Sequence, residues 1–167
     1  MKIKVVLADD EELFRVGMSH ILSKDNELEI IFQASNGKEL IEFLTTAKEL
    51  PDIIIMDIDM PNSSGLSIIK TLKQNNPEVR IIIFSHQPEE LYALSAIRFG
   101  ASGYINKSKS LKKIKTAIDQ VARGGIYLSK VISEKISSKS SSKTGVVSKY
   151  RALSSREIEV LNFISKG

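Results

Sequence analysis

The feature that most constrains the fold is a run of apolar residues that ends on a carboxylate, Ile53-Ile54-Ile55-Met56-Asp57. A run of this length, bounded by turn residues, is typical of a strand that is buried on both faces of a parallel sheet. Its last residue then lies at the carboxyl end of the strand, where open α/β sheets place their ligand sites. The run therefore predicts an α/β fold and singles out Asp57 as a candidate functional residue.

Four candidate strands end at polar residues in this way. They are residues 3–8 followed by Asp9 and Asp10, residues 53–56 followed by Asp57, residues 79–84 followed by Ser85, and residues 103–105 followed by Asn106 and Lys107. The carboxyl ends of parallel strands meet at one edge of a sheet. The sequence therefore predicts a pocket with three carboxylates, a small hydroxyl and a single ammonium group.

Strand and helix patterns alternate from residue 3 to about residue 123 and make five strand–helix units. Such an alternation predicts a doubly wound, five-stranded parallel sheet with helices on both faces. We interpret residues 1–124 as this α/β domain. Residues 125–150 begin with a short helical pattern and continue as a Ser- and Lys-rich linker. Residues 151–167 carry a further amphipathic helical pattern.

Capping residues predict where the helices begin and end. The predicted N-terminal positions are Asn36, Ser64 or Gly65, Pro88 and Ser110, and the predicted C-terminal stop is Gly100.

The composition excludes several classes of protein. The absence of cysteine rules out disulfides and thiolate metal sites. No apolar run reaches the length of a membrane span, and the run at the N-terminus is too short for a signal peptide. We therefore expect a cytoplasmic protein with no membrane partner. The net charge of +4 permits contact with nucleic acid but does not by itself predict it.

The three carboxylates Asp9, Asp10 and Asp57 determine the chemistry that the pocket can perform. Like charges about 4 Å apart repel by roughly 4 kcal/mol at an effective dielectric constant near 20. Such a cluster either raises its pKa values or binds a cation, and oxygen ligands with room for water suit Mg²⁺. Ser85 and Lys107 would bind the oxygens of a phosphoryl group on Asp57. The pocket therefore suits the formation and hydrolysis of an aspartyl phosphate.

These motifs resemble the receiver domain of response regulators in two-component signalling, which has the flavodoxin-like or CheY-like fold. The matching elements are the acidic pair Asp9-Asp10, the segment Ile55-Met56-Asp57-Ile58-Asp59-Met60-Pro61, the hydroxyl of Ser85 and the segment Tyr104-Ile105-Asn106-Lys107. Their order and spacing agree over residues 3–123. The resemblance implies that Asp57 accepts a phosphoryl group from a sensor histidine kinase, with Ser85 and Lys107 assisting.

The same resemblance implies further roles. Ser85 and Tyr104 would form the conformational switch. Mg²⁺ would be bound directly by Asp10 and Asp57, through water by Asp9, and by the backbone carbonyl of Asp59. The protein would not be an enzyme beyond its own phosphorylation and dephosphorylation, and phosphorylation would favour a homodimer.

The segment Leu153-Ser154-Ser155-Arg156-Glu157-Ile158-Glu159-Val160-Leu161 resembles the first helix of the LuxR-type DNA-binding domain in regulators of the NarL/FixJ kind. The full-length regulator would then bind DNA and control transcription. The helix-turn-helix pair of that domain is absent from this sequence, so we expect this chain not to recognise a specific operator.

Two other functions remain as alternatives. The segment Asp57-Ile58-Asp59 also resembles the nucleophile motif of phosphatases of the haloacid dehalogenase type, which place it on their first strand. The other alternative is a receiver-like interaction module that works without phosphorylation.

Overall fold

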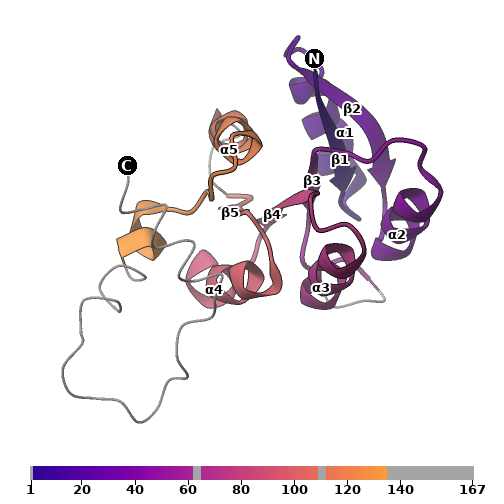
Figure 1. Cartoon of the computed structure of the whole chain (residues 1–167). Coiled ribbons are helices and arrows are strands. Elements are labelled where there is room, and N and C mark those ends of the chain that lie inside the picture. Colours follow the sequence, from indigo (N-terminus) through magenta and orange to yellow (C-terminus); the bar gives the residue numbers. More distant parts are fainter. Residues whose placement is uncertain (1, 62–64, 109–111, 135–167) are drawn as a thin grey trace.

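The computed structural model describes residues 2–61, 65–108 and 112–134. Strands and helices alternate strictly along the described chain (Figure 1). They are β1 (Ile3–Ala8), α1 (Glu12–Leu22), β2 (Leu28–Ala34), α2 (Gly37–Thr46), β3 (Ile53–Met56), α3 (Gly65–Asn75), β4 (Arg80–Ser85), α4 (Glu89–Phe99), β5 (Gly103–Asn106) and α5 (Lys112–Ala122). The predicted five-stranded α/β architecture is confirmed.

The sheet is parallel throughout and has the strand order β2-β1-β3-β4-β5. The central strand β3 pairs with β1 through Ala8 and Met56, and with β4 through Met56 and Ile83. The chain first adds a strand on one side of β1 and then adds the remaining strands on the other side. The order therefore reverses beside β3, and in doubly wound sheets the ligand site lies at such a switch point.

Alternate residues of each strand pack into two separate cores, as expected for a sheet that is covered on both faces. In β1, Val6 and Ala8 face the core with α2, α3 and α4, whereas Val5 and Leu7 face the core with α1 and α5. Figure 1 shows α2, α3 and α4 along one side of the sheet and α5 on the other. All four residues of β3 are buried, which explains why its sequence is a continuous apolar run.

The helix ends follow the capping chemistry of the sequence. The side chain of Asn36 accepts a hydrogen bond from the backbone N–H of Glu39 at 2.9 Å and so caps α2. Gly100 ends α4 in the left-handed conformation, with φ of 110°, which favours glycine. Pro88 occupies the N-cap of α4, just before the predicted first turn. Helix α3 begins at Gly65, and Ser64 and Ser110 lie outside the described residues.

Some predicted boundaries were slightly wrong. Strand β4 begins and ends one residue later than predicted, so that Ser85 is its last residue, and β5 extends to Asn106. The helix predicted over residues 128–136 is helical at residues 130–134, and residues 135 and 136 lie outside the described part of the chain. The predicted linker beyond residue 134 and the predicted helix in residues 151–167 lie outside the described part of the chain.

The segment after α5 extends the sheet beyond β5. Tyr127 forms a parallel bridge with Gly103, in which the N–H of Tyr104 donates to the carbonyl of Tyr127 at 3.0 Å. The buried side chains of Ile126 and Ile132 then join the core on the α4 side of the sheet. The segment, orange in Figure 1, therefore passes around the edge of the sheet from α5 to α4.

Among the described residues, no helix has the length and apolar character that a membrane span requires.

We predict that Gly65→Ala destabilises the protein by about 1–3 kcal/mol through overpacking. A Cβ atom at Gly65 would lie 2.5 Å from both the Cα and the carbonyl oxygen of Ile58, so the backbone after Asp57 would have to move. Denaturant unfolding measures the effect. Gly17→Ala in α1 is the control, because a Cβ there meets nothing within 4 Å and alanine favours the helix. Equal stability of the Gly65 variant and the parent would contradict the prediction.

Candidate functional site

The carboxyl ends of four strands bring the predicted pocket together. Backbone hydrogen bonds continue the ladder beyond the strand ends, from the N–H of Asp57 to the carbonyl of Ala8 (2.9 Å) and from the N–H of Lys107 to the carbonyl of Ser85 (2.7 Å). The functional side chains therefore project from the rigid edge of the sheet, which fixes their positions.

Asp57 is buried, with 4% of its surface exposed, and both oxygens of its carboxylate are hydrogen-bonded. Oδ1 accepts from the backbone N–H of Ile58 at 2.6 Å and from that of Asp59 at 3.1 Å. Oδ2 accepts from the Nζ of Lys107 at 2.5 Å. These three donors hold the carboxylate at the end of the central strand, where it opens toward the acidic pair.

Lys107 is the cation at the centre of the site. Its side chain is fully buried, and its Nζ lies 2.9 Å from Asp9 Oδ2, 2.9 Å from Glu11 Oε2 and 2.5 Å from Asp57 Oδ2. The same nitrogen lies 4.9 Å from the centre of the Phe14 ring, in a cation–π arrangement. Burial by itself lowers the pKa of the ammonium, but the hydrogen bonds to Asp57, Asp9 and Glu11 outweigh it and raise the pKa. Lys107 is therefore positively charged.

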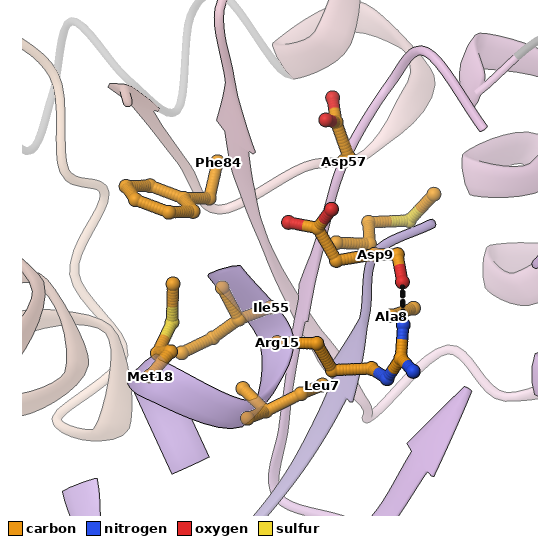
Figure 2. A pocket seen from close by; sticks show the side chains of 9 residues that line it. Leu7, Ala8, Asp9, Arg15, Met18, Ile55, Asp57 and Phe84 are labelled. Atoms are coloured by element: carbon orange, nitrogen blue, oxygen red, sulfur yellow. Dashed lines mark hydrogen bonds between the residues drawn. The ribbon is translucent and has the colours of Figure 1, made fainter. Parts of the chain in front are cut away.

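Asp9 lies between the ammonium and the start of α1. Burial raises the pKa of its carboxyl group, and the hydrogen bond from Lys107 only partly offsets this effect. Its Oδ1 also accepts from the backbone N–H of Glu11 at 3.0 Å. Arg15 donates to its carbonyl oxygen at 2.5 Å, the bond drawn in Figure 2. Asp9 is thus fixed both through its side chain and through its backbone.

The carboxylates of Asp9, Asp10 and Asp57 form a group that could hold a metal ion, with ligand oxygens within 4.8 Å of one another. Asp9 and Asp57 are buried, whereas Asp10 is exposed. A small cavity of about 10 Å³ lies beside Asp9 and Asp57. Figure 2 shows its apolar floor of Leu7, Ile55 and Met18. Three carboxylate groups, one of them open to solvent, suit a hard divalent cation that keeps part of its water.

The two predicted switch residues meet at the loop after β4. The Oγ of buried Ser85 lies 3.3 Å from Asp59 Oδ2 and 3.3 Å from the N–H of Gln87. The hydroxyl of Tyr104 donates to the carbonyl of Gln87 at 3.0 Å, and the residue is 1% exposed. Burial raises the pKa of Tyr104, and the nearby charges of Asp57 and Asp59 raise it further, so its hydroxyl remains a donor.

The structure therefore gathers the carboxylates of Asp9, Asp10 and Asp57 with Ser85 and Lys107 at one edge of the sheet. The side chain of Asp59 is exposed and faces Ser85. Tyr104 belongs to the core on the α4 side of the sheet, and its hydroxyl reaches the loop after β4.

The sequence analysis did not identify three residues at the start of α1 that contact the site. They are Glu11 and Phe14, which contact Lys107, and Arg15, which binds the backbone of Asp9. Glu11 directly follows the acidic pair, and this position was a signal for a further charged group at the pocket. Phe14 belonged to an apolar helical stripe, and its contact with Lys107 could be seen only once α1 was packed on the sheet.

Comparisons with known proteins show what this chain is similar to. Residues 5–119 match the family described as the response regulator receiver domain. The transcriptional regulatory protein DegU of Brevibacillus brevis is 35% identical over 127 residues, which cover 76% of this chain and 53% of DegU. The oxygen regulatory protein NreC of Staphylococcus aureus is 32% identical over 99% of this chain and 78% of NreC. The chain thus spans about half the length of DegU.

Two solved structures show the same similarity. A two-component response regulator of the LuxR family from Aurantimonas sp. SI85-9A1 has a TM-score of 0.75 and 25% identity, covering 84% of this chain and 99% of that one. The signal receiver domain of the putative response regulator NarL from Mycobacterium tuberculosis has a TM-score of 0.68 and 27% identity. The match covers 74% of this chain and 98% of that one.

We predict that Lys107→Ala lowers the free energy of unfolding by about 3–5 kcal/mol, because it leaves buried carboxylates without their counter-ion. Added Mg²⁺ should then stabilise the variant more than the parent, since a cation in the acidic cluster replaces the lost positive charge. Denaturant unfolding with and without MgCl₂ measures both effects. Lys115→Ala is the control, because Lys115 pairs with Asp25 at the surface, on α5. A Mg²⁺ response that is equal in parent and Lys107 variant would contradict the prediction.

Proposed function

This chain belongs to the response regulator receiver domain family, and from that membership we propose that Asp57 accepts a phosphoryl group from a sensor histidine kinase. One observation carries the proposal above all. The buried Asp57 carboxylate ends the central strand, 2.5 Å from the ammonium of Lys107 and beside two further carboxylates. A nucleophile, a cation and a cation-binding cluster thus occupy one edge of the sheet.

The proposed reaction follows from this arrangement. A carboxylate oxygen of Asp57 attacks the phosphorus atom of the donor, and a P–O bond forms. The P–N bond to the donor histidine breaks, and its electron pair remains on the imidazole nitrogen. Lys107 and Ser85 bind oxygens of the transferred group and stabilise their charge. Attack by water on the same phosphorus atom later releases inorganic phosphate and restores the Asp57 carboxylate.

A magnesium ion fits the donor set of the pocket, which consists of carboxylate oxygens only. We propose that Asp10 and Asp57 bind it directly, Asp9 through a water molecule and Asp59 through its backbone carbonyl. When bound, the ion neutralises the negative charge of the phosphoryl group against the surrounding carboxylates.

The conformational change that follows phosphorylation of Asp57 would begin in the loop after β4. The contacts of the Ser85 hydroxyl with Asp59 and Gln87 are long, at 3.3 Å each, so a phosphoryl oxygen can compete for it. Movement of residues 85–87 changes the carbonyl on which the Tyr104 hydroxyl rests. The backbone of Tyr104 is in turn bonded to Tyr127 in the segment after α5, so a shift of the switch reaches the chain that follows the receiver.

We propose that the whole regulator acts in the cytoplasm and controls transcription. The support is the resemblance of residues 153–161 to a LuxR-type DNA-binding helix and the similarity to DegU, which is called a transcriptional regulatory protein. In this proposal residues 1–124 are the receiver, 125–150 a connecting helix and linker, and 151–167 the start of the DNA-binding domain. Phosphorylation would favour a homodimer.

The alternatives are less well supported. In phosphatases of the haloacid dehalogenase type the nucleophile follows the first strand, whereas here Asp57 follows β3 and the acidic pair follows β1. We therefore propose that the chain turns over no separate phosphomonoester substrate. A module that works without phosphorylation would have no need of the carboxylates, hydroxyl and lysine that this pocket retains.

We predict that incubation with acetyl phosphate and Mg²⁺ adds the mass of one phosphoryl group, and that Asp57→Ala or chelation of the metal abolishes this addition. Intact-protein mass spectrometry measures it. Asp52→Asn, at the opposite end of β3, is the control and should be modified like the parent. Single-site modification that persists in Asp57→Ala would contradict the assignment, and sustained hydrolysis of a generic phosphomonoester would support the phosphatase instead.

We further predict that beryllofluoride, a phosphoryl mimic, changes amide hydrogen exchange in β4, α4, β5 and residues 126–134. Lys107→Ala should reduce this response, because Lys107 joins Asp57 to the end of β5. The measurement is exchange mass spectrometry of the parent and the variant, with and without the mimic. Equal responses in both proteins would show that Lys107 does not couple the site to the switch.

A further inference from the structure

Glu11 is a fourth carboxylate at the site, beyond the three that could hold a metal. Its Oε2 lies 2.9 Å from the Nζ of Lys107. It differs from Asp9 and Asp57 in its surroundings, because 45% of the Glu11 side chain is exposed, against 7% and 5% for the other two. It is also the residue just before α1, and its partly exposed side chain reaches the ammonium from the start of that helix.

The ammonium of Lys107 has no spare donor in this arrangement. A lysine ammonium carries three N–H groups, and Lys107 directs them to Asp9, Glu11 and Asp57. The N–H that Lys107 gives to Asp57 can pass to a phosphoryl oxygen, but a second bond from Lys107 to the phosphoryl group requires Asp9 or Glu11 to release its N–H. Asp9 is buried and is held by the N–H of Glu11 at 3.0 Å. Glu11 is the acceptor that is free to move toward solvent.

A second partner for Glu11 lies nearby. The Nε2 of His86 is 3.5 Å from the same Oε2 atom, and the His86 ring packs edge-on against Phe14 with centroids 5.4 Å apart. His86 follows directly after Ser85. A Glu11 side chain that leaves Lys107 therefore remains beside a polar group of the loop that carries the switch hydroxyl.

We propose that Glu11 is a positioning residue that holds Lys107 in the unphosphorylated state and competes with the phosphoryl group for it. This inference rests on the proposed function of Asp57. Its physical basis is that a phosphoryl group that takes the N–H from Glu11 breaks the Glu11–Lys107 ion pair, and that the released Glu11 carboxylate repels the phosphoryl group. Glu11 therefore shifts the equilibrium of the receiver toward its unphosphorylated form.

The test compares Glu11→Gln with Glu12→Gln, which removes the same charge one residue further along. Beryllofluoride with Mg²⁺ is titrated into the 167-residue chain. Glu11→Gln should bind the mimic about three- to fivefold more tightly than the parent, the factor expected for a partly exposed ion pair. Glu12→Gln should bind it like the parent. Equal affinities of the two variants would overturn the proposal, because the effect would then be one of general charge.

A second measurement needs no ligand. Without the mimic, Glu11→Gln should raise the unfolding equilibrium constant of the parent but should not raise that of Lys107→Ala, since the ion pair is already broken there. An equal effect in both backgrounds would overturn the proposal. A parent that fails to bind beryllofluoride, or an Asp57→Ala variant that is still phosphorylated, would instead refute the proposed function and is recognised separately.

Discussion

The buried ammonium of Lys107 balances two carboxylates that the parallel sheet forces together. Asp9 and Asp57 follow adjacent strands, β1 and β3, and cannot separate without breaking the ladder that joins Ala8 to Met56. Their mutual repulsion would be costly away from water. Lys107, at 2.9 Å from one and 2.5 Å from the other, offsets that repulsion. It can do so because β5 ends beside β4 at the same edge of the sheet.

Lys107 does not neutralise all the negative charge of the site, and the remaining charge determines what the site can bind. One ammonium faces the carboxylates of Asp9, Asp57 and Glu11, and Asp10 lies beside them. The pocket therefore retains excess negative charge, which favours binding of a divalent cation. In the proposed function, a phosphoryl group on Asp57 would change this charge balance, because it would compete for Lys107 and for any bound cation. Charge added at one residue can thus reorganise several contacts at once.

Hydrogen bonds, most of them to backbone groups, connect the loop after β4 with β5, with α4 and with the segment after α5. The carbonyl of Gln87 receives the Tyr104 hydroxyl, and the N–H of Tyr104 binds the carbonyl of Tyr127. Glu89 at the start of α4 accepts the N–H of Ser129 at 2.7 Å. The segment after α5 is therefore tied both to β5 and to α4. These two elements flank the loop that carries Ser85, so the segment is placed to respond when that loop moves.

Much of the fold and the site could be predicted from local sequence signals. The apolar run before Asp57 implied a buried parallel strand because only such a strand is covered on both faces, and Asn36 and Gly100 marked helix ends through their own backbone chemistry. The polar residues after four strands implied a common pocket because parallel strands end at the same edge. Boundaries such as that of β4 were less certain, because strand ends depend on the pairing partner.

The sequence by itself determined which carboxylates, which hydroxyl and which ammonium group follow the strands, and hence that they meet at one edge of the sheet. Only the tertiary structure decided how these groups are held. The contacts of Lys107 with Glu11 and Phe14 join residues that are 96 and 93 positions apart in the chain. They depend on how α1 packs against the end of the sheet, as does the hydrogen bond from Arg15 to the backbone of Asp9. The bridge between Tyr127 and Gly103 likewise depends on the exposed edge of β5. Such contacts leave no periodic signal in the sequence, because they are set by packing between elements and not by the conformation of any one of them.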